Sequence, residues 1–167
     1  MYKGIIRPLL FLLNPETVHH LVIALIRFLF AVPFVKPIVS ALYATRDIKL
    51  RREVFGLSFE NPVGLAAGFD KNATFYRQFS AFGFSFIEVG TVTPLGQPGN
   101  ARPRSFRLRE DRALINRMGF NNQGARTIAE RLGRGRTDMI VGGNIGKNTN
   151  TPNESAEEDY ADAFLAM

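Results

Sequence analysis

The sequence has no cysteine and only two histidines in 167 residues. The absence of cysteine excludes disulfide bonds and thiolate metal ligands, and two histidines do not give the spacing of a zinc site. We therefore expect no bound metal. With 46% hydrophobic residues, the chain is apolar enough to form one globular core, which excludes a mainly disordered protein.

Long hydrophobic runs are also missing. Residues 5–35 are rich in leucine, isoleucine, phenylalanine and valine, but Arg7, Pro8, His19 and Arg27 interrupt them. The longest apolar stretch is shorter than the roughly 18–20 residues that a spanning helix requires. Charges recur inside the apolar part and no small-residue cleavage site follows it. We therefore expect neither a transmembrane helix nor a signal peptide.

Positive charge is concentrated near the N-terminus. Residues 1–52 contain eight lysines and arginines against Glu16 and Asp47, whereas basic and acidic residues balance over residues 53–167. A domain that binds nucleic acid carries basic surface through its folded body, together with a groove-reading motif. Neither is visible here, so we expect no nucleic-acid partner.

Two short helices are predicted near the N-terminus, over residues 3–12 and 15–31, with Asn14 as the N-cap and Pro15 as the first helical position of the second. The second helix carries an apolar stripe at helical spacing, and further apolar residues flank that stripe. One interpretation is a helical pair packed on its own domain. The other is a pair lying in the membrane interface, with basic residues facing anionic headgroups, and the excess of apolar residues favours it.

The remainder of the chain alternates predicted strands and helices. A hairpin is expected around Gly56, and helices are expected over 72–82, over 124–132 and from Asn153 onward. Three apolar runs that end in glycine or polar residues are predicted to be buried parallel strands, over residues 62–67, 84–91 and 139–145. This alternation predicts an α/β fold with a parallel sheet.

The ends of such strands form the ligand-binding rim in a (β/α)₈ barrel, and residues 61–167 hold only about three βα units of a fold that needs roughly 250 residues. We therefore expect the N-terminal part of a TIM barrel preceded by a small helical membrane-associating domain. The expected division is residues 1–45 for the helical domain and 46–167 for an incomplete barrel. The third strand should present an unpaired edge, and the chain should be a fragment of a longer protein.

Asparagines gather at the predicted strand ends and loops. An amide offers both a donor and an acceptor, which suits the alternating C=O and N–H edge of a pyrimidine or a flavin. Asparagine also favours turns and caps, which explains any one of them equally well. The five residues are Asn116, Asn121, Asn122, Asn144 and Asn148.

Five segments closely resemble the quinone-using class of dihydroorotate dehydrogenases. The resemblance runs from about residue 14 to the C-terminus, and the helical pair matches because this class carries an N-terminal helical domain. The segments are NPVGLAAGFDK (61–71), GTVTP (90–94), QPGNARPRSFRL (97–108), INRMGFNN (115–122) and NIGKN (144–148).

The resemblance implies an FMN site, a substrate loop and a quinone site. Residues expected to line the FMN ring are Ala67, Gly68, Lys71, Thr91 and Asn144. Residues expected to hold dihydroorotate or orotate are Lys71, Asn116, Arg117, Met118, Gly119 and Phe120. His19 and Arg107 match positions that face the quinone tunnel in this class, although His19 is equally explained as a core or surface histidine.

The implied reaction belongs to de novo pyrimidine (UMP) biosynthesis. A base removes a proton from C5 of dihydroorotate while a hydride leaves C6 for the flavin, and the electrons then reach ubiquinone or menaquinone. Such an enzyme would lie peripherally on the cytoplasmic face of the bacterial inner membrane. The base in this class is a serine that would follow residue 167, so no catalytic base is expected here and the 167 residues should be inactive alone.

Two other functions remain open from the sequence. A soluble FMN barrel oxidoreductase that uses fumarate or NAD would share the rim motifs but lack the helical pair. A non-catalytic membrane-surface module would use the asparagine and lysine rim only as structure. Sedimentation of the full-length protein with membranes would exclude the soluble oxidoreductase. Flavin absorbance of the intact protein would exclude the non-catalytic module.

Overall fold

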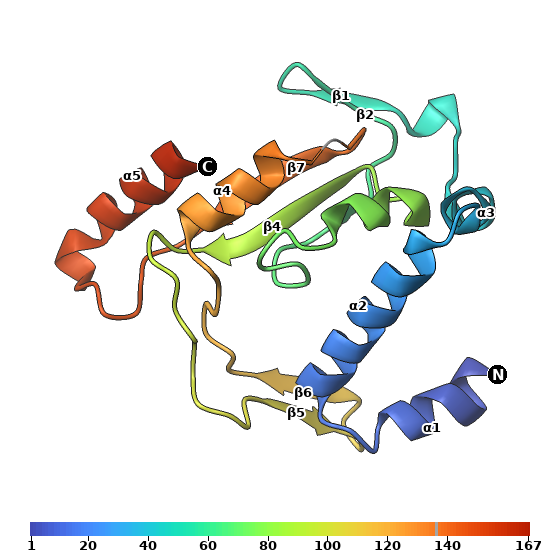
Figure 1. Ribbon diagram of the computed structural model, residues 1–167, viewed down its shortest axis with the longest axis horizontal. Helices are drawn as coiled ribbons and strands as arrows, with labels where there is room; N and C mark the ends of the chain where they lie inside the picture. Colours follow the sequence, from blue (N-terminus) through green and yellow to red (C-terminus); the bar gives the residue numbers. More distant parts are fainter. Residues whose placement is uncertain (136) are drawn as a thin grey trace.

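The computed structural model describes residues 1–135 and 137–167 (Figure 1). The first part of the chain is helical, and the rest mixes short strands with helices, as expected for an α/β protein. The N-terminal elements are the π-helical turn η1 (Tyr2–Ile6) and the helices α1 (Arg7–Leu10), α2 (Pro15–Ala31) and α3 (Val35–Tyr43).

Helix α2 begins and ends where local signals place it. The Asn14 side chain accepts a hydrogen bond from the Glu16 backbone N–H at 2.9 Å, and Pro15 occupies the first helical position. The helix stops at Ala31 because the chain turns extended at Val32, the residue before Pro33. The prediction for this helix is confirmed.

The flanking helices differ from the prediction. The expected helix over 3–12 is instead a π-helical turn followed by the short α1, so it is both irregular and shorter. Helix α3 was not predicted, and it contains Pro37 in its first turn. Proline is tolerated in the first turn of a helix, where its missing N–H has no intrahelical partner to lose.

The predicted hairpin around Gly56 is confirmed. Strands β1 (Arg52–Val54) and β2 (Leu57–Phe59) pair antiparallel through a two-residue turn. Phe55 and Gly56 both have positive φ, at 53° and 75°, which is the conformation that tight two-residue hairpins use.

Three parallel strands form the central sheet, in the order β3-β4-β7. They are β3 (Gly64–Leu65), β4 (Phe86–Val92) and β7 (Ile140–Ile145), so the prediction of parallel strands is confirmed, although β3 is much shorter than residues 62–67. Within the described residues β7 pairs only with β4, so its other side is an open edge, as predicted.

The helices between these strands were predicted with mixed success. Helix α4 (Ala125–Gly133) matches the prediction. The segment over 72–82 is a 3₁₀ helix, η3 (Tyr76–Phe82), because the Asp70 carboxylate accepts hydrogen bonds from the Thr74 and Phe75 N–H groups and fixes a turn before it. Asn153 lies in a 3₁₀ turn (η4, Asn153–Ser155) and does not cap α5 (Ala156–Ala166), whose N-cap is Ser155.

A second hairpin was not predicted. Strands β5 (Ser105–Leu108) and β6 (Ala113–Asn116) pair antiparallel and lie beside the N-terminal end of α2 (Figure 1). Every residue of β6 is exposed. The sequence ALIN does not alternate apolar and polar residues, which is the pattern that marks a half-buried strand, so this strand was missed.

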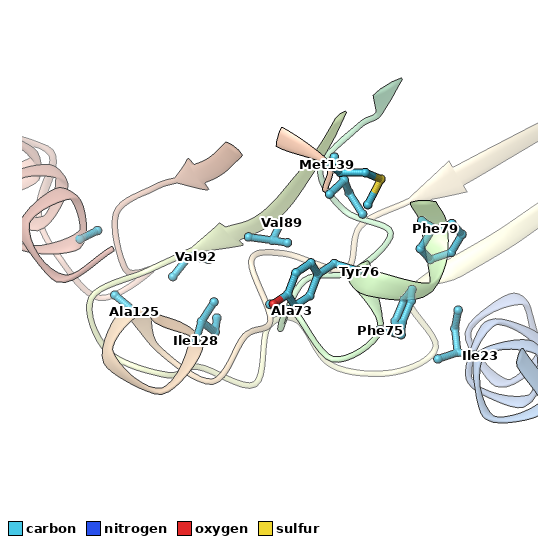
Figure 2. Close-up of a cluster of buried hydrophobic side chains, with 12 residues drawn as sticks. Ile23, Ala73, Phe75, Tyr76, Phe79, Val89, Val92, Ala125, Ile128 and Met139 are labelled. Carbon is cyan, nitrogen blue, oxygen red and sulfur yellow. The ribbon is translucent and has the colours of Figure 1, made fainter. Parts of the chain in front are cut away.

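The hydrophobic core lies between β4 and the helices that cover it (Figure 2). Ile87, Val89 and Val92 of β4 are fully buried, and Ile128 of α4 packs in the same cluster. Helix α2 contributes only Ile23 to the buried apolar residues among those described. Most of its apolar surface is therefore not used in packing on this chain.

Candidate active site

A cavity of about 930 Å³ lies between α2, the ends of β3 and β4, and residues 116–121. Most of the predicted site residues line it, which brings together segments far apart in the sequence. The lining includes Ala67, Gly68, Lys71, Thr91, Asn116, Arg117, Met118, Gly119, Phe120 and His19. Asn144 and Arg107 are not among the lining residues.

Lys71 follows β3 through a turn that its neighbours hold in place. The Gly68 N–H donates to the Gly90 carbonyl at 2.8 Å, and the buried Asp70 fixes the turn after it. The Lys71 Nζ donates to the Gly119 carbonyl at 3.1 Å and to Asn121 Oδ1 at 2.8 Å. Lys71 thus joins the strand end to the loop after β6.

The surroundings of Lys71 favour an anionic ligand. Burial lowers the pKa of the Lys71 ammonium group, the charge of Arg104 lowers it further, and the charge of Glu16 opposes both. A cation that is half-removed from water gains more from a bound anion than one on the surface does. The cavity can therefore bind a group with negative or developing negative charge.

Thr91 and Asn144 lie at the ends of adjacent strands. The Thr91 hydroxyl donates to Asn144 Oδ1 at 2.6 Å, and Gly90 is in register with Asn144. Thr91 lines the cavity, whereas Asn144 contacts Thr91 but does not itself line the cavity. A direct contact of Asn144 with a flavin remains a prediction.

The loop after β6 begins one residue later than expected. Asn116, predicted to belong to the loop, is the last residue of β6, because it pairs in register with Ser105. Its Oδ1 accepts a hydrogen bond from the Met118 N–H at 2.9 Å, which starts the turn. Gly119 has a φ of 70°, which glycine adopts without strain.

The remaining asparagines serve the chain's own structure. Asn122 is buried and donates to the Thr93 hydroxyl at 2.8 Å and to the Phe120 carbonyl at 2.7 Å. Asn148 is buried and donates to the Leu95 carbonyl at 2.8 Å. For these two residues the structural explanation of asparagine is correct, and the ligand interpretation is not supported.

The two residues predicted for a quinone site lie in different surroundings. His19 of α2 lines the cavity, and its ring packs edge-on against Phe69 at 4.8 Å between centroids. Burial lowers the pKa of His19, and the neighbouring His20 adds to the effect. Arg107 of β5 donates to the Leu13 carbonyl at 2.6 Å and lies 4.4 Å from the centre of the Phe11 ring, so it ties the hairpin to the chain between α1 and α2.

A buried ion pair that was not predicted joins α2 to the segment before β5. Arg104 donates from Nη2 to Glu16 Oε1 at 2.6 Å and from Nε to Oε2 at 3.1 Å. Arg102 adds a bond to Oε1 at 2.9 Å. No sequence signal pairs residues 88 positions apart, so the structure was needed to find this contact.

Comparison with known proteins fits this geometry. Residues 49–167 match the sequence model of the family described as dihydroorotate dehydrogenase. The chain belongs to the dihydroorotate dehydrogenase family. A relative from Christiangramia forsetii, named dihydroorotate dehydrogenase (quinone), is 52% identical over all of this chain and 49% of its own length. One from Mycobacterium tuberculosis with the same name is 50% identical over 93% of this chain and 44% of its own length.

Solved dihydroorotate dehydrogenases share the fold. The structure from Eimeria tenella in complex with ferulenol has a TM-score of 0.67 and 40% identity, covering 88% of this chain and 39% of the other. The ligand-free form has a TM-score of 0.68 and 39% identity, covering 90% and 41%. The chain spans about half the length of the curated relatives that it matches.

The Glu16 ion pair predicts how the stability of this protein depends on pH. Hydrogen bonds from Arg104 lower the pKa of Glu16 below 4.5, and burial only partly opposes them. A lowered pKa in the folded state gives stability that is present above about pH 4.5 and is lost as the pH falls through the folded value. We expect Glu16→Gln to lower the free energy of unfolding at pH 7 by about 3 kcal/mol.

Denaturant unfolding of the wild type and of Glu16→Gln between pH 7 and pH 3 measures this. The gap between the two proteins should begin to shrink as the pH falls below about 4.5, because the unfolded wild type then binds a proton at Glu16 that the folded state still resists. It should be smallest once the pH is below the lowered pKa of the folded state. Glu60→Gln, which breaks the exposed Arg51–Glu60 pair, is the control and should have little effect at any pH. A gap that is the same at pH 7 and pH 3 would contradict the prediction.

Proposed function

We propose that these residues are the N-terminal part of a quinone-dependent dihydroorotate dehydrogenase that oxidises dihydroorotate to orotate in pyrimidine biosynthesis. The observation that carries the proposal is the position of the Lys71 ammonium group, which lines the cavity after strand β3. It donates hydrogen bonds to the Gly119 carbonyl and to the Asn121 side chain. The same segments gave the family resemblance, and relatives about half identical to the chain carry this enzyme's name.

The cavity residues fit FMN as the cofactor. A Cβ placed on Gly68 would meet nothing within 4 Å, so a flat ring can lie directly against the backbone there. Lys71 supplies a cation and Thr91 a hydroxyl, the chemistry that an electron-rich ring system requires. When bound, FMN supplies the redox chemistry, by accepting a hydride from the substrate and passing the electrons to a quinone.

In this proposal each part of the cavity has a separate task. Lys71 stabilises negative charge near the reacting atoms, and Ala67, Gly68 and Thr91 hold the ring. Asn116 and the loop to Phe120 orient the substrate. The base that takes the C5 proton is assigned to a serine outside these 167 residues.

The proposed organisation is a helical domain over residues 1–45 and part of a (β/α)₈ barrel over residues 46–167. The order β3-β4-β7 supports the barrel, because successive parallel strands there lie side by side. The free edge of β7 supports further strands in the complete enzyme.

We further propose that the helical domain lies on the cytoplasmic face of the bacterial inner membrane and admits ubiquinone or menaquinone past His19 and Arg107. Exposed apolar residues on α1, α2 and α3 support this, together with the basic charge of the segment. Among the described residues no single helix has the length and apolar character of a membrane span; Tyr2–Leu10 and Pro15–Ala31 have it only as a pair bent by 114°.

The proposal is tested with the full-length protein that carries these residues. We expect it to be purified yellow, to lose flavin absorbance when dihydroorotate is added without an acceptor, and to regain it with a quinone. The 167-residue polypeptide alone should retain little FMN and should not turn over, because its relatives use about twice this length.

The same measurements separate the alternatives. Reoxidation by fumarate or NAD instead of quinone, with no sedimentation on membranes, would indicate a soluble FMN oxidoreductase. Absence of flavin from the full-length protein would leave the membrane-surface module. Turnover by the 167 residues alone would show that the catalytic base lies within them.

A further inference from the structure

Glu16, in the first turn of α2, reaches across to the segment before β5. Its carboxylate and the Arg104 guanidinium form a two-pronged ion pair, with bonds of 2.6 Å and 3.1 Å. The Glu16 side chain is only 7% exposed and that of Arg104 only 6%. A charged pair this deeply buried depends on both partners, since removing one leaves the other without compensation.

The third guanidinium nitrogen of Arg104, Nη1, donates hydrogen bonds to the turn of residues 98–100. Nη1 donates to the Pro98 carbonyl at 2.8 Å and to the Asn100 carbonyl at 2.9 Å. Gly99, between them, has a φ of 75°, and a Cβ there would lie 2.4 Å from the Met118 carbonyl oxygen. The turn of residues 98–100 is thus hydrogen-bonded to Arg104 on one side and packs closely against the loop after β6 on the other.

The same turn holds that loop in place. The Asn100 N–H donates to the Met118 carbonyl at 3.0 Å, and Asn100 Nδ2 donates to the Arg117 carbonyl at 2.7 Å. The Arg117 N–H donates to the Arg104 carbonyl at 2.9 Å. One residue further on, the Gly119 carbonyl accepts the bond from Lys71.

We infer that Glu16 is a positioning residue for the substrate: through Arg104 and the turn of residues 98–100, it fixes the loop of residues 116–120 that binds dihydroorotate. This inference rests on the proposed function for its substrate. It also gives α2 a role in substrate binding, separate from any role in quinone access.

Loss of the Glu16 charge should act on the loop through Arg104. Without the carboxylate, the buried guanidinium gains by turning toward water and gives up its bonds to Pro98 and Asn100. The loop then has more conformations to lose when the substrate binds, and affinity falls. Glu16 also contributes to the charge around Lys71, but the Lys71 ammonium group itself stays in place, so we expect the maximal rate to change far less than the affinity.

The test uses the full-length holoenzyme with Glu16→Gln, an isosteric change that removes the charge. We expect KM for dihydroorotate and Kd for orotate to rise about tenfold, while kcat stays within about twofold of wild type. Arg104→Lys keeps a charge but not the planar fork, and it should raise KM in the same way. The effect of the double variant, relative to wild type, should be smaller than the sum of the two single effects, because both substitutions break the same series of contacts.

Phe30→Leu is the matched control. It weakens a second contact of α2, the stacking of Phe30 on Phe82, on a residue that does not line the cavity. It should lower the melting temperature but leave KM unchanged. Glu60→Gln, on an exposed pair, should change neither.

The outcomes distinguish this inference from the proposed function. A wild-type enzyme that does not oxidise dihydroorotate rejects the proposed function itself. An active wild type with unchanged KM in Glu16→Gln and Arg104→Lys overturns the inference, and so does an equal rise of KM in Phe30→Leu. If Glu16→Gln fails to fold, Arg104→Lys alone decides between these results.

Discussion

Replacement of Lys71 by methionine in the full-length enzyme is expected to lower kcat/KM for dihydroorotate by about 10²- to 10³-fold, as loss of one preorganised active-site donor does. Methionine keeps the length and the apolar stem of the side chain but removes its charge. The variant also loses the bonds to the Gly119 carbonyl and to Asn121 Oδ1, which join the segment after β3 to the loop after β6. Both losses act on the same cavity.

Stopped-flow reduction of the bound flavin by dihydroorotate measures the chemical step directly. The loss should appear in the limiting reduction rate, because Lys71 acts on charge that develops during the reaction. Lys49→Met is the matched control, since Lys49 is an exposed lysine outside the cavity, and it should behave as wild type. A Lys71→Met enzyme that reduces its flavin at the wild-type rate would show that Lys71 is only a structural tie.

The elements with strong local signals could be predicted from the sequence. Helix α2 has a capping asparagine, a proline at its first position and an apolar stripe, and each signal depends only on neighbouring residues. Strand β4 lies in a mainly apolar run, and all of its residues are buried or partly buried, as is typical of a strand inside a parallel sheet. In both elements the local preferences agree with the tertiary environment.

Elements held by distant contacts could not be predicted. The β5–β6 hairpin is largely exposed, and it is joined to the helical part by Arg107, Arg109 and the buried Arg104. The segment before η3 follows the Asp70 carboxylate, which competes with regular helical hydrogen bonds over Thr74 and Phe75. Such contacts depend on which segments meet in the fold, and a sequence pattern does not give that.

The candidate site divides in the same way. The motif segments supply many of the residues that line the cavity, including Lys71 and the loop to Phe120, because each segment ends at or near a strand. Their roles toward a ligand stay predictions. The segments did not show that Asn144 contacts Thr91 or that Arg107 binds the Leu13 carbonyl. They also missed Glu16, because an acidic residue in the first turn of a helix already has an explanation in the helix dipole.

Charged substitutions on the exposed face of α2 should release the enzyme from membranes. Leu25 is 53% exposed and Phe28 is 70% exposed, and neither lines the cavity. The exposed apolar surface continues on α3 with Ile38 and Leu42. Burial of a leucine or phenylalanine contributes about 1.5–3 kcal/mol, so Leu25→Glu with Phe28→Glu should weaken binding to vesicles by about 10²-fold or more.

Sedimentation with vesicles that contain anionic lipid measures this binding. The control, Val54→Glu with Leu57→Glu, places the same charges on exposed apolar residues of the β1–β2 hairpin and should change binding far less. Both double variants leave the cavity and the Glu16–Arg104 pair intact, so each should oxidise dihydroorotate normally with a water-soluble acceptor. Only the α2 variant should reduce vesicle-bound quinone slowly. Equal sedimentation of both double variants would place the membrane contact elsewhere on the protein.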